Sequence, residues 1–223
     1  MPSSSLQVGF AYYGRDLIVL TVADNKFHLI QNVSLGSVND LISCPEKSKG
    51  TPLYTALHSI GAITDSSTPT NGCLSTLKPI DYIEQRWMTP LTSAAPLRRM
   101  DIIKALYALL RAAFCVRFGG FKRVMSVETE SHSRTLTADD HDEILNRAKA
   151  SLNKVFFLDF SKNKCLTYSL ALTLILRRKI PSVKLIVGVR TRPFLSHAWV
   201  EQDNRVISDD PDLRNKLAVI LEL

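Results

Sequence analysis

The spacing of apolar positions changes along the chain, from strand-like at both ends to helix-like in the middle. Near the start, apolar and β-branched runs cover residues 7–13, 17–22 and 26–30, and turn residues such as Ala23–Asn25 separate them. Short runs of this kind between turn signals are typical of strands joined by tight connections. The pattern therefore predicts a small antiparallel sheet of three strands.

Two short helices are predicted after this sheet. Ser37–Ile42 opens with a residue that favours the N-cap position. Thr51–Ile60 has a second capping residue, Pro52 at the first helical position and Gly61 as a stop signal. A stretch with two prolines and several Thr, Ser and Ala residues follows at 87–97. It predicts a linker between a first domain, 1–86, and a second domain, 98–223.

Helical spacing dominates the start of the second domain. An apolar helix is predicted over 100–118, ended by Gly119-Gly120, and another begins near the capping pattern at Thr137. A third covers about 164–178, with leucines every fourth residue, and Pro181 ends it.

The helix predicted at 100–118 is the most apolar long segment of the chain. Lys104, Arg111 and Arg117 interrupt it, and it is short for a membrane span. We therefore expect an amphipathic helix buried on the protein and no stable membrane insertion. A helix lying on a membrane surface is the alternative.

Strands close the chain. Val183–Val189 is almost entirely apolar, which predicts a buried strand, and a turn follows at 190–193. Ser196–Glu201 and Arg205–Ser208 are predicted to form a hairpin around Asp203-Asn204. With the helices before them, these elements predict an α+β fold.

Composition and charge restrict the class of protein. Of the 223 residues, 45% are apolar and 22% charged, which is ordinary for a globular protein with its own core. The net charge of +7 favours acidic partners such as nucleic acid, an anionic membrane face or an acidic peptide. The plainer alternative is dispersed surface charge that keeps the protein in solution. The four cysteines have neither CxxC nor zinc-finger spacing, and the start shows no signal-peptide pattern. We therefore expect no metal, no cofactor and a cytoplasmic location.

Cys165 is the first candidate for chemistry. It falls in the first turn of the helix predicted at 164–178, beside Lys162 and Lys164. The positive end of a helix and nearby cations both favour a thiolate, which is the nucleophilic form of cysteine. The alternative is a small buried residue without a chemical role.

His197 and Asp209 complete a possible acyl-transfer arrangement. His197 lies on a predicted strand and Asp209 follows the next one, so hairpin pairing brings them close. The imidazole would accept the thiol proton, and the carboxylate would orient the ring. A solvated histidine and a turn carboxylate are the plainer alternatives. Asp210 is an equally available orienter.

Five sequence blocks resemble those of lasso-peptide maturation proteases. The likeness runs from about Phe157 to the C-terminus and is weaker around Glu84–Trp87. The blocks are Cys165–Ser169, Gly188–Thr191, Ser196–Glu201, Asp209–Pro211 and Lys216–Ile220.

This resemblance implies a transglutaminase-like, papain-related cysteine peptidase domain. It assigns the catalytic roles to Cys165, His197 and Asp209, and favours Asp209 over Asp210. It also implies removal of the leader from a ribosomal precursor peptide, together with an asparagine-synthetase-like cyclase that uses ATP.

The first domain resembles a winged-helix-like element that recognises precursor peptides. Such elements add the leader as an extra strand at an exposed sheet edge. The resemblance places that edge at Phe27, His28 and Leu29. A wing that merely packs on the second domain is the alternative.

The sequence leaves two other functions open. A transglutaminase-type enzyme would pass the acyl group to an amine instead of water. A protein without catalysis would bind peptide or nucleic acid. No basic recognition helix is found in residues 37–60, so nucleic acid is not the expected partner.

Overall fold

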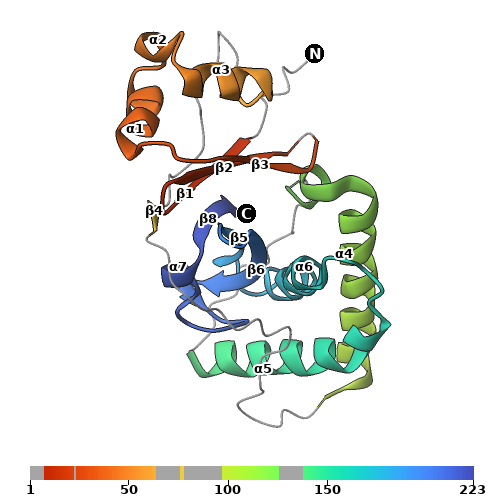
Figure 1. Cartoon of the computed structure of the whole chain (residues 1–223). Coiled ribbons are helices and arrows are strands. Elements are labelled where there is room, and N and C mark those ends of the chain that lie inside the picture. Colours follow the sequence, from red (N-terminus) through yellow and green to blue (C-terminus); the bar gives the residue numbers. More distant parts are fainter. Residues whose placement is uncertain (1–7, 23, 64–75, 78–96, 126–137) are drawn as a thin grey trace. The chain divides into compact units, whose positions relative to one another are not determined.

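The computed structural model describes residues 8–22, 24–63, 76–77, 97–125 and 138–223 (Figure 1). The fold is α+β, as expected. The chain forms two compact units: the first holds 1–82, 188–196 and 214–221, and the second holds 83–187, 197–213 and 222–223. The predicted linker at 87–97 lies outside the described residues except for residue 97. The domain limits proposed from the sequence therefore stay a prediction.

The first sheet contains the three strands predicted near the start. These are β1 (Val8–Tyr13), β2 (Asp16–Thr21) and β3 (Lys26–Ile30), paired antiparallel in sequence order. A short β4 (Thr76–Leu77), which was not predicted, pairs parallel with β1. The order β3-β2-β1-β4 leaves β3 at an edge of the described sheet.

Three helices lie on one side of this sheet: α1 (Leu35–Ser43), α2 (Pro45–Ser48) and α3 (Pro52–Ser59). Alternate residues of β1 and β2 face these helices, because side chains alternate between the two faces of a strand. The core that results contains Phe10, Tyr12, Leu17, Val19, Val33, Val38, Leu41, Leu53, Leu57, Ala62 and Ile63.

The caps of these helices confirm one prediction and correct another. Thr51 accepts a hydrogen bond from the backbone N–H of Tyr54 at 3.2 Å, as its position before Pro52 predicted. The helix predicted to begin at Ser37 instead begins at Leu35. Ser34 is extended and accepts from the Ser37 N–H at 3.0 Å. That bond makes Ser37 the third residue of the helix and not its cap.

The second unit contains three long helices: α4 (Arg99–Met125), α5 (Ala138–Val155) and α6 (Lys164–Leu176). A short 3-10 helix, η1 (Phe156–Leu158), leads out of α5. The prediction that Gly119-Gly120 ends the first of these helices is wrong, since α4 continues through both. A glycine inside a helix costs only about 1 kcal/mol relative to alanine. A glycine stop also requires the left-handed backbone conformation, which helical residues do not adopt.

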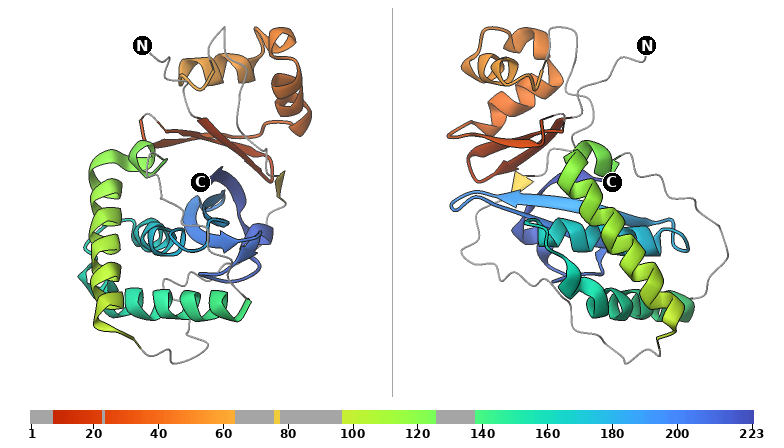
Figure 2. Two further views of the ribbon diagram at one scale, coloured as in Figure 1. Left: turned by 180° about the vertical axis from the view of Figure 1, so that it is seen from behind. Right: turned by 90° about the vertical axis from the view of Figure 1, so that its right-hand side faces the viewer.

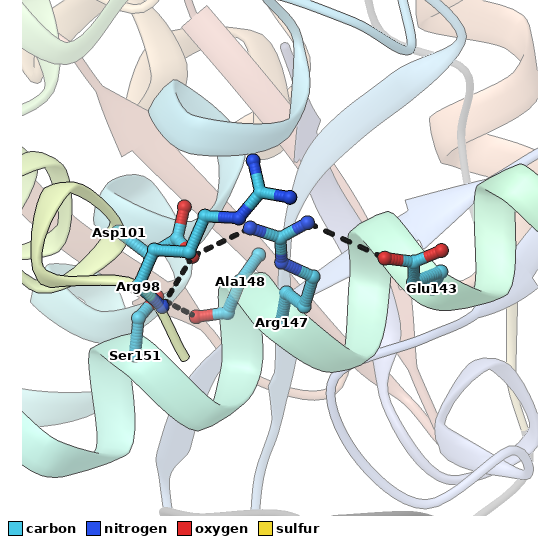
Figure 3. A network of polar contacts seen from close by, with 6 residues as sticks. All are labelled: Arg98, Asp101, Glu143, Arg147, Ala148 and Ser151. Atoms are coloured by element: carbon cyan, nitrogen blue, oxygen red, sulfur yellow. Dashed lines mark hydrogen bonds and ion pairs between the residues drawn. The ribbon is translucent and has the colours of Figure 1, made fainter. Parts of the chain in front are cut away.

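One face of α4 packs on α5 and α6 (Figures 1 and 2). Arg147 of α5 bridges Asp101 of α4 at 2.7 Å and Glu143 at 3.3 Å (Figure 3). Among the residues of α4 up to Phe118, the buried ones are Ala105, Ala108, Leu109, Ala112 and Cys115. The described part of α4 therefore has one buried face and one exposed face, as an amphipathic helix does, and large apolar side chains lie on the exposed face. In the described part of the chain, no helix combines the length and apolarity needed to cross a membrane.

The second sheet has the order β7-β6-β5-β8. Its strands are β5 (Val183–Arg190), β6 (Leu195–Gln202), β7 (Arg205–Val206) and β8 (Ala218–Glu222), with a short α7 (Leu213–Lys216) before the last. The predicted β6–β7 hairpin is confirmed, although β7 is shorter than expected. Asp203 and Asn204 have φ values of 49° and 63°, which suit the tight turn of a two-residue hairpin. Strand β8 was not predicted.

Candidate active site

A hydrogen-bond network holds the first turn of α6, where Cys165 lies. The buried Asp159 accepts from the N–H of Ser161 at 2.9 Å and from its hydroxyl at 2.8 Å. The Ser161 hydroxyl is 2.8 Å from that of Thr167, which in turn donates to the backbone carbonyl of Asn163. The network ties the loop before the helix to its first turns. It therefore holds the half-buried Cys165, the second residue of α6, in place.

A second contact sets the position of α6 along β6. Ser169 lies one turn after Cys165 and on the same side of the helix. Its hydroxyl donates to the backbone carbonyl of Ala198 at 2.9 Å, and both residues are buried. Ala198 directly follows His197. This bond therefore aligns the turn that carries the thiol with the part of the strand that carries the imidazole.

The chain beyond β7 stays beside β6 although the strand pairing has ended. The N–H of Ile207 donates to the Val200 carbonyl at 2.9 Å. The N–H of Val200 donates to the Ser208 hydroxyl at 2.8 Å. The next residue, Asp209, is thereby brought to His197. Its Oδ2 lies 2.7 Å from His197 Nε2, and the two side chains are 6% and 4% exposed.

The structure also distinguishes the two adjacent carboxylates. Asp209 Oδ2 meets the imidazole, while its Oδ1 accepts from the N–H of Asp210 at 2.8 Å. The Asp210 carboxylate accepts instead from the N–H of Asp212 at 2.9 Å. Of the two candidates left open by the residue pattern, Asp209 is the one that reaches His197.

The environment of His197 favours its charged form. Burial lowers the pKa of the imidazole, but hydrogen bonds and negative charges from Asp209 and Cys165 outweigh burial and raise that pKa to about 9. Because Nε2 is engaged by Asp209, Nδ1 is the ring nitrogen that remains for Cys165. The carboxylate of Asp209 and the side chain of Cys165 both act on this imidazole, and a cysteine nucleophile depends on such a base and its orienter.

We call Cys165, His197 and Asp209 the candidate row. Several residues around the candidate row were not singled out in the sequence. Trp199 lies two residues along β6, its ring 6.3 Å from that of His197 and nearly parallel to it. Its indole N–H donates at 2.7 Å to the buried Glu201. The signal that marks them is the alternation of 197, 199 and 201 on one strand face. Ser169 and Ser208 gave no such signal, because their bonds join segments far apart in the sequence.

Tyr168 also belongs to the surroundings of the site. Burial raises the pKa of its hydroxyl, and the negative charge of Asp209 raises that pKa further. The hydroxyl donates to Asn153 Oδ1 at 2.8 Å. Tyr168 therefore remains a neutral donor near Asp209 and is no candidate for a base.

The other thiols have different surroundings. Cys44 is exposed, Cys115 is buried and neither is in a disulfide. Cys73 lies outside the described residues. Within the described ranges, no three His, Cys, Asp or Glu side chains are grouped so as to hold a metal ion.

The residues predicted to bind a leader belong to a different unit from the candidate row. Phe27, His28 and Leu29 are in the first unit, whereas Cys165, His197 and Asp209 are in the second. Leu29 is 41% exposed on β3, and the Phe27 ring centre is 5.5 Å from that of Phe194. His28 Nε2 lies 3.3 Å from the Thr21 hydroxyl on β2.

Comparison with known proteins gives two matches. The model of the transglutaminase-like superfamily matches residues 108–222, which include all three members of the row. The chain is also 28% identical over 217 residues to the microcin J25-processing protein McjB of Escherichia coli, covering 95% of this chain and 96% of that protein. No solved structure matches significantly. The two matches confirm the similarity inferred from the sequence blocks and the fold expected from them.

Proposed function

The chain belongs to the transglutaminase-like superfamily, and on this premise we propose that it is a cysteine peptidase of lasso-peptide maturation. It removes the leader from a ribosomal precursor peptide and releases the N-terminus of the core. The observation that carries the proposal is the buried pair of His197 and Asp209 at 2.7 Å, with Cys165 close enough to help raise the pKa of the same imidazole. Similarity to McjB over nearly the whole chain supports the choice of substrate class.

In the proposed reaction, the Cys165 thiolate attacks the carbonyl carbon of the scissile bond. His197 gives its proton to the leaving amine, which becomes the N-terminus of the core. Water then attacks the thioester, loses a proton to His197 and releases the leader as a carboxylic acid. Asp209 keeps the ring oriented and stabilises the imidazolium. The backbone N–H of Cys165 lies in the first helical turn, where it is not used within the helix, and is a donor for the oxyanion.

The leader binds, in this proposal, along the edge strand β3. An edge strand offers unpaired backbone N–H and C=O groups to an incoming strand. Phe27, His28 and Leu29 lie in the middle of β3, and the side chain of Leu29 is exposed. Backbone pairing would supply affinity, and side-chain contacts would select the leader. The partner of the next step is an asparagine-synthetase-like cyclase, which uses ATP to join the new amine to a side-chain carboxylate.

Replacing the nucleophile tests the proposal. The substrate is a synthetic precursor peptide, taken from a short open reading frame that neighbours this gene. Cys165→Ala removes the sulfur, so we expect no cleavage by mass spectrometry, with or without the cyclase, while a labelled leader still binds. Cys44→Ala, which removes an exposed thiol elsewhere, is the matched control and should cleave normally. Cleavage retained by Cys165→Ala would rule out the assigned nucleophile.

A transglutaminase-type reaction is the second candidate, favoured by membership of the superfamily itself. The same thioester would then be attacked by an amine, giving an amide in place of the leader acid. The mass of the product distinguishes the two reactions. A free leader acid supports the peptidase, and a leader joined to an added amine supports the transferase.

A further inference from the structure

The outer face of α4 carries a row of large apolar side chains that the fold leaves exposed. Each is between 49% and 69% exposed, and each follows the last by three or four residues. At 100° per residue, the row falls within an arc of about 80° on the helix surface. We call it the α4 stripe; it consists of Met100, Ile103, Tyr107, Leu110, Phe114 and Phe118.

Among the described residues, the side chains of the stripe keep about half or more of their surface exposed. The side of α4 that contacts α5 and α6 is the opposite one, lined by small residues such as Ala108 and Ala112. Phe114 and Phe118 do contact each other, with ring centres 4.9 Å apart, yet both remain exposed. An apolar surface that stays exposed over this length marks a site of interaction with another molecule or a membrane.

The charges beside the stripe restrict the class of partner that it can bind. At the same helical angle, Arg99 and Arg117 lie along one edge of the stripe, and Lys104 and Arg111 along the other. Asp101 is the single acidic residue of α4, and Arg147 already pairs with it at 2.7 Å. The stripe is therefore bordered on both sides by positive charge that no acidic residue of the helix balances.

We infer that the outer face of α4 docks on the anionic surface of a lipid bilayer. Aromatic and aliphatic side chains in one straight row, flanked by Arg and Lys, are typical of helices that lie in the membrane interface. The long basic side chains reach the headgroups while the apolar row enters the acyl boundary. The row from Met100 to Phe118 is about 27 Å long, which a planar surface accommodates along its whole length.

A second copy of the chain fits this surface less well. Two α4 stripes packed against each other would bring their basic borders together without acidic partners on the helix. Like charges held close across an interface are unfavourable. The same charge pattern that favours an anionic bilayer therefore opposes a symmetric dimer.

The first test uses the full-length protein with vesicles of phosphatidylcholine alone or with about 30% phosphatidylglycerol. We expect co-sedimentation at least about tenfold stronger with the anionic vesicles, since each basic side chain near such a surface contributes about fivefold. Binding should weaken as salt is added. Equal binding to both vesicles, or none to either, would overturn the inference.

Two sets of variants separate the apolar and charged contributions. Ile103→Ser, Leu110→Ser and Phe114→Ser combined should weaken binding to anionic vesicles at least tenfold. Leu35→Ser with Ile42→Ser, at exposed apolar positions of α1, is the matched control and should bind like the original protein. Because all five positions are exposed, the variants should keep their circular dichroism spectra and melting temperatures. Undiminished binding by the α4 variant would contradict the inference.

The charge variant combines Arg99→Gln, Lys104→Gln and Arg117→Gln. It should lose the preference for anionic vesicles while remaining folded. A Phe114→Trp protein gives an independent readout, because indole emission shifts to shorter wavelength when the ring enters lipid. A concentration-dependent dimer that disappears in the apolar variant, without vesicle binding, would show that a second copy occupies the stripe and would overturn the lipid assignment. None of these readouts depends on peptidase activity.

Discussion

Strands β3 and β6 each carry a histidine, and the two surroundings differ in kind. His28 is half-buried on an edge strand, with a threonine hydroxyl 3.3 Å away. His197 is 4% exposed, lies 2.7 Å from a carboxylate and has its pKa raised to about 9. An edge strand offers unused backbone groups and suits the binding of another strand. A buried imidazole paired with a carboxylate suits proton transfer, because low local polarity strengthens the interaction between them.

The largest effect should come from the carboxylate that orients the buried histidine. Asp209→Ala removes the partner of Nε2 and the charge that stabilises the imidazolium, so kcat/KM for the precursor should fall about 1,000-fold. Asp210→Ala changes the adjacent carboxylate, whose Oδ1 accepts from the N–H of Asp212, and should stay within about threefold. Steady-state cleavage assays on both folded variants measure the contrast. Similar losses in the two would remove the distinction between these carboxylates.

Stability should depend on pH through the same histidine. Its folded-state pKa of about 9 lies above the ordinary 6.5 of an unfolded chain. Its contribution to the free energy of unfolding is therefore complete below pH 6.5 and is lost as pH rises through 9. One pKa unit corresponds to about 1.4 kcal/mol, so the loss is roughly 3 kcal/mol.

Urea unfolding between pH 6 and 9.5 measures this dependence. Subtracting the curve of His197→Gln isolates the histidine from other groups, such as Lys149, whose pKa burial lowers. A difference that stays constant or grows with pH would contradict the assignment.

A smaller effect is expected at the edge strand, and on a different kinetic constant. Leu29→Glu places a charge on β3, which discourages the addition of a strand. Leader binding should weaken about tenfold and KM should rise, whereas kcat at saturating precursor should stay unchanged. Leu35→Glu on α1, of similar exposure, is the control. A fall in kcat with unchanged leader affinity would place Leu29 outside the leader site.

The smallest expected effect is on stability, and it compares the loss of one serine hydroxyl in each of the two units. Ser169→Ala removes the buried hydroxyl bond to the Ala198 carbonyl, and should cost about 1 kcal/mol of stability. Ser59→Ala removes an exposed bond to the Ala56 carbonyl at 2.7 Å and should cost less than about 0.5 kcal/mol. Thermal unfolding of both variants measures the difference. Equal costs would show that burial does not strengthen the contact between α6 and β6.

The success of sequence analysis in each region follows from the range of the contacts involved. The three N-terminal strands, the Thr51 cap and the Asp203-Asn204 turn depend on neighbouring residues, and all were predicted. The cap at Ser34 was missed because Ser37, three residues later, has the same intrinsic preference. The short strands β4 and β8 were missed because each owes its existence to a partner distant in the sequence.

The candidate row shows the same division. Its three residue types and their order along the chain were read from the sequence and from a family resemblance. The hydrogen bonds that hold these residues in place were not predicted, because the hydroxyls of Ser169 and Ser208 bond to groups 29 and 8 residues away. The exposure of one face of α4 could not be predicted either. An apolar run has the same sequence pattern whether other elements cover one side of the helix or both.

By itself, the sequence determined many local elements of this protein: the turn at Asp203-Asn204, the cap at Thr51, and a cysteine in a first helical turn with a histidine and two aspartates after it. The residue pattern left two aspartates and the family resemblance favoured Asp209, which the tertiary structure brings to the imidazole; only the tertiary structure decided which apolar side chains remain exposed. The physical reason is that turn and cap preferences act between near neighbours. Burial, the raised pKa of His197 and the α4 stripe depend instead on segments that meet only when the chain has folded.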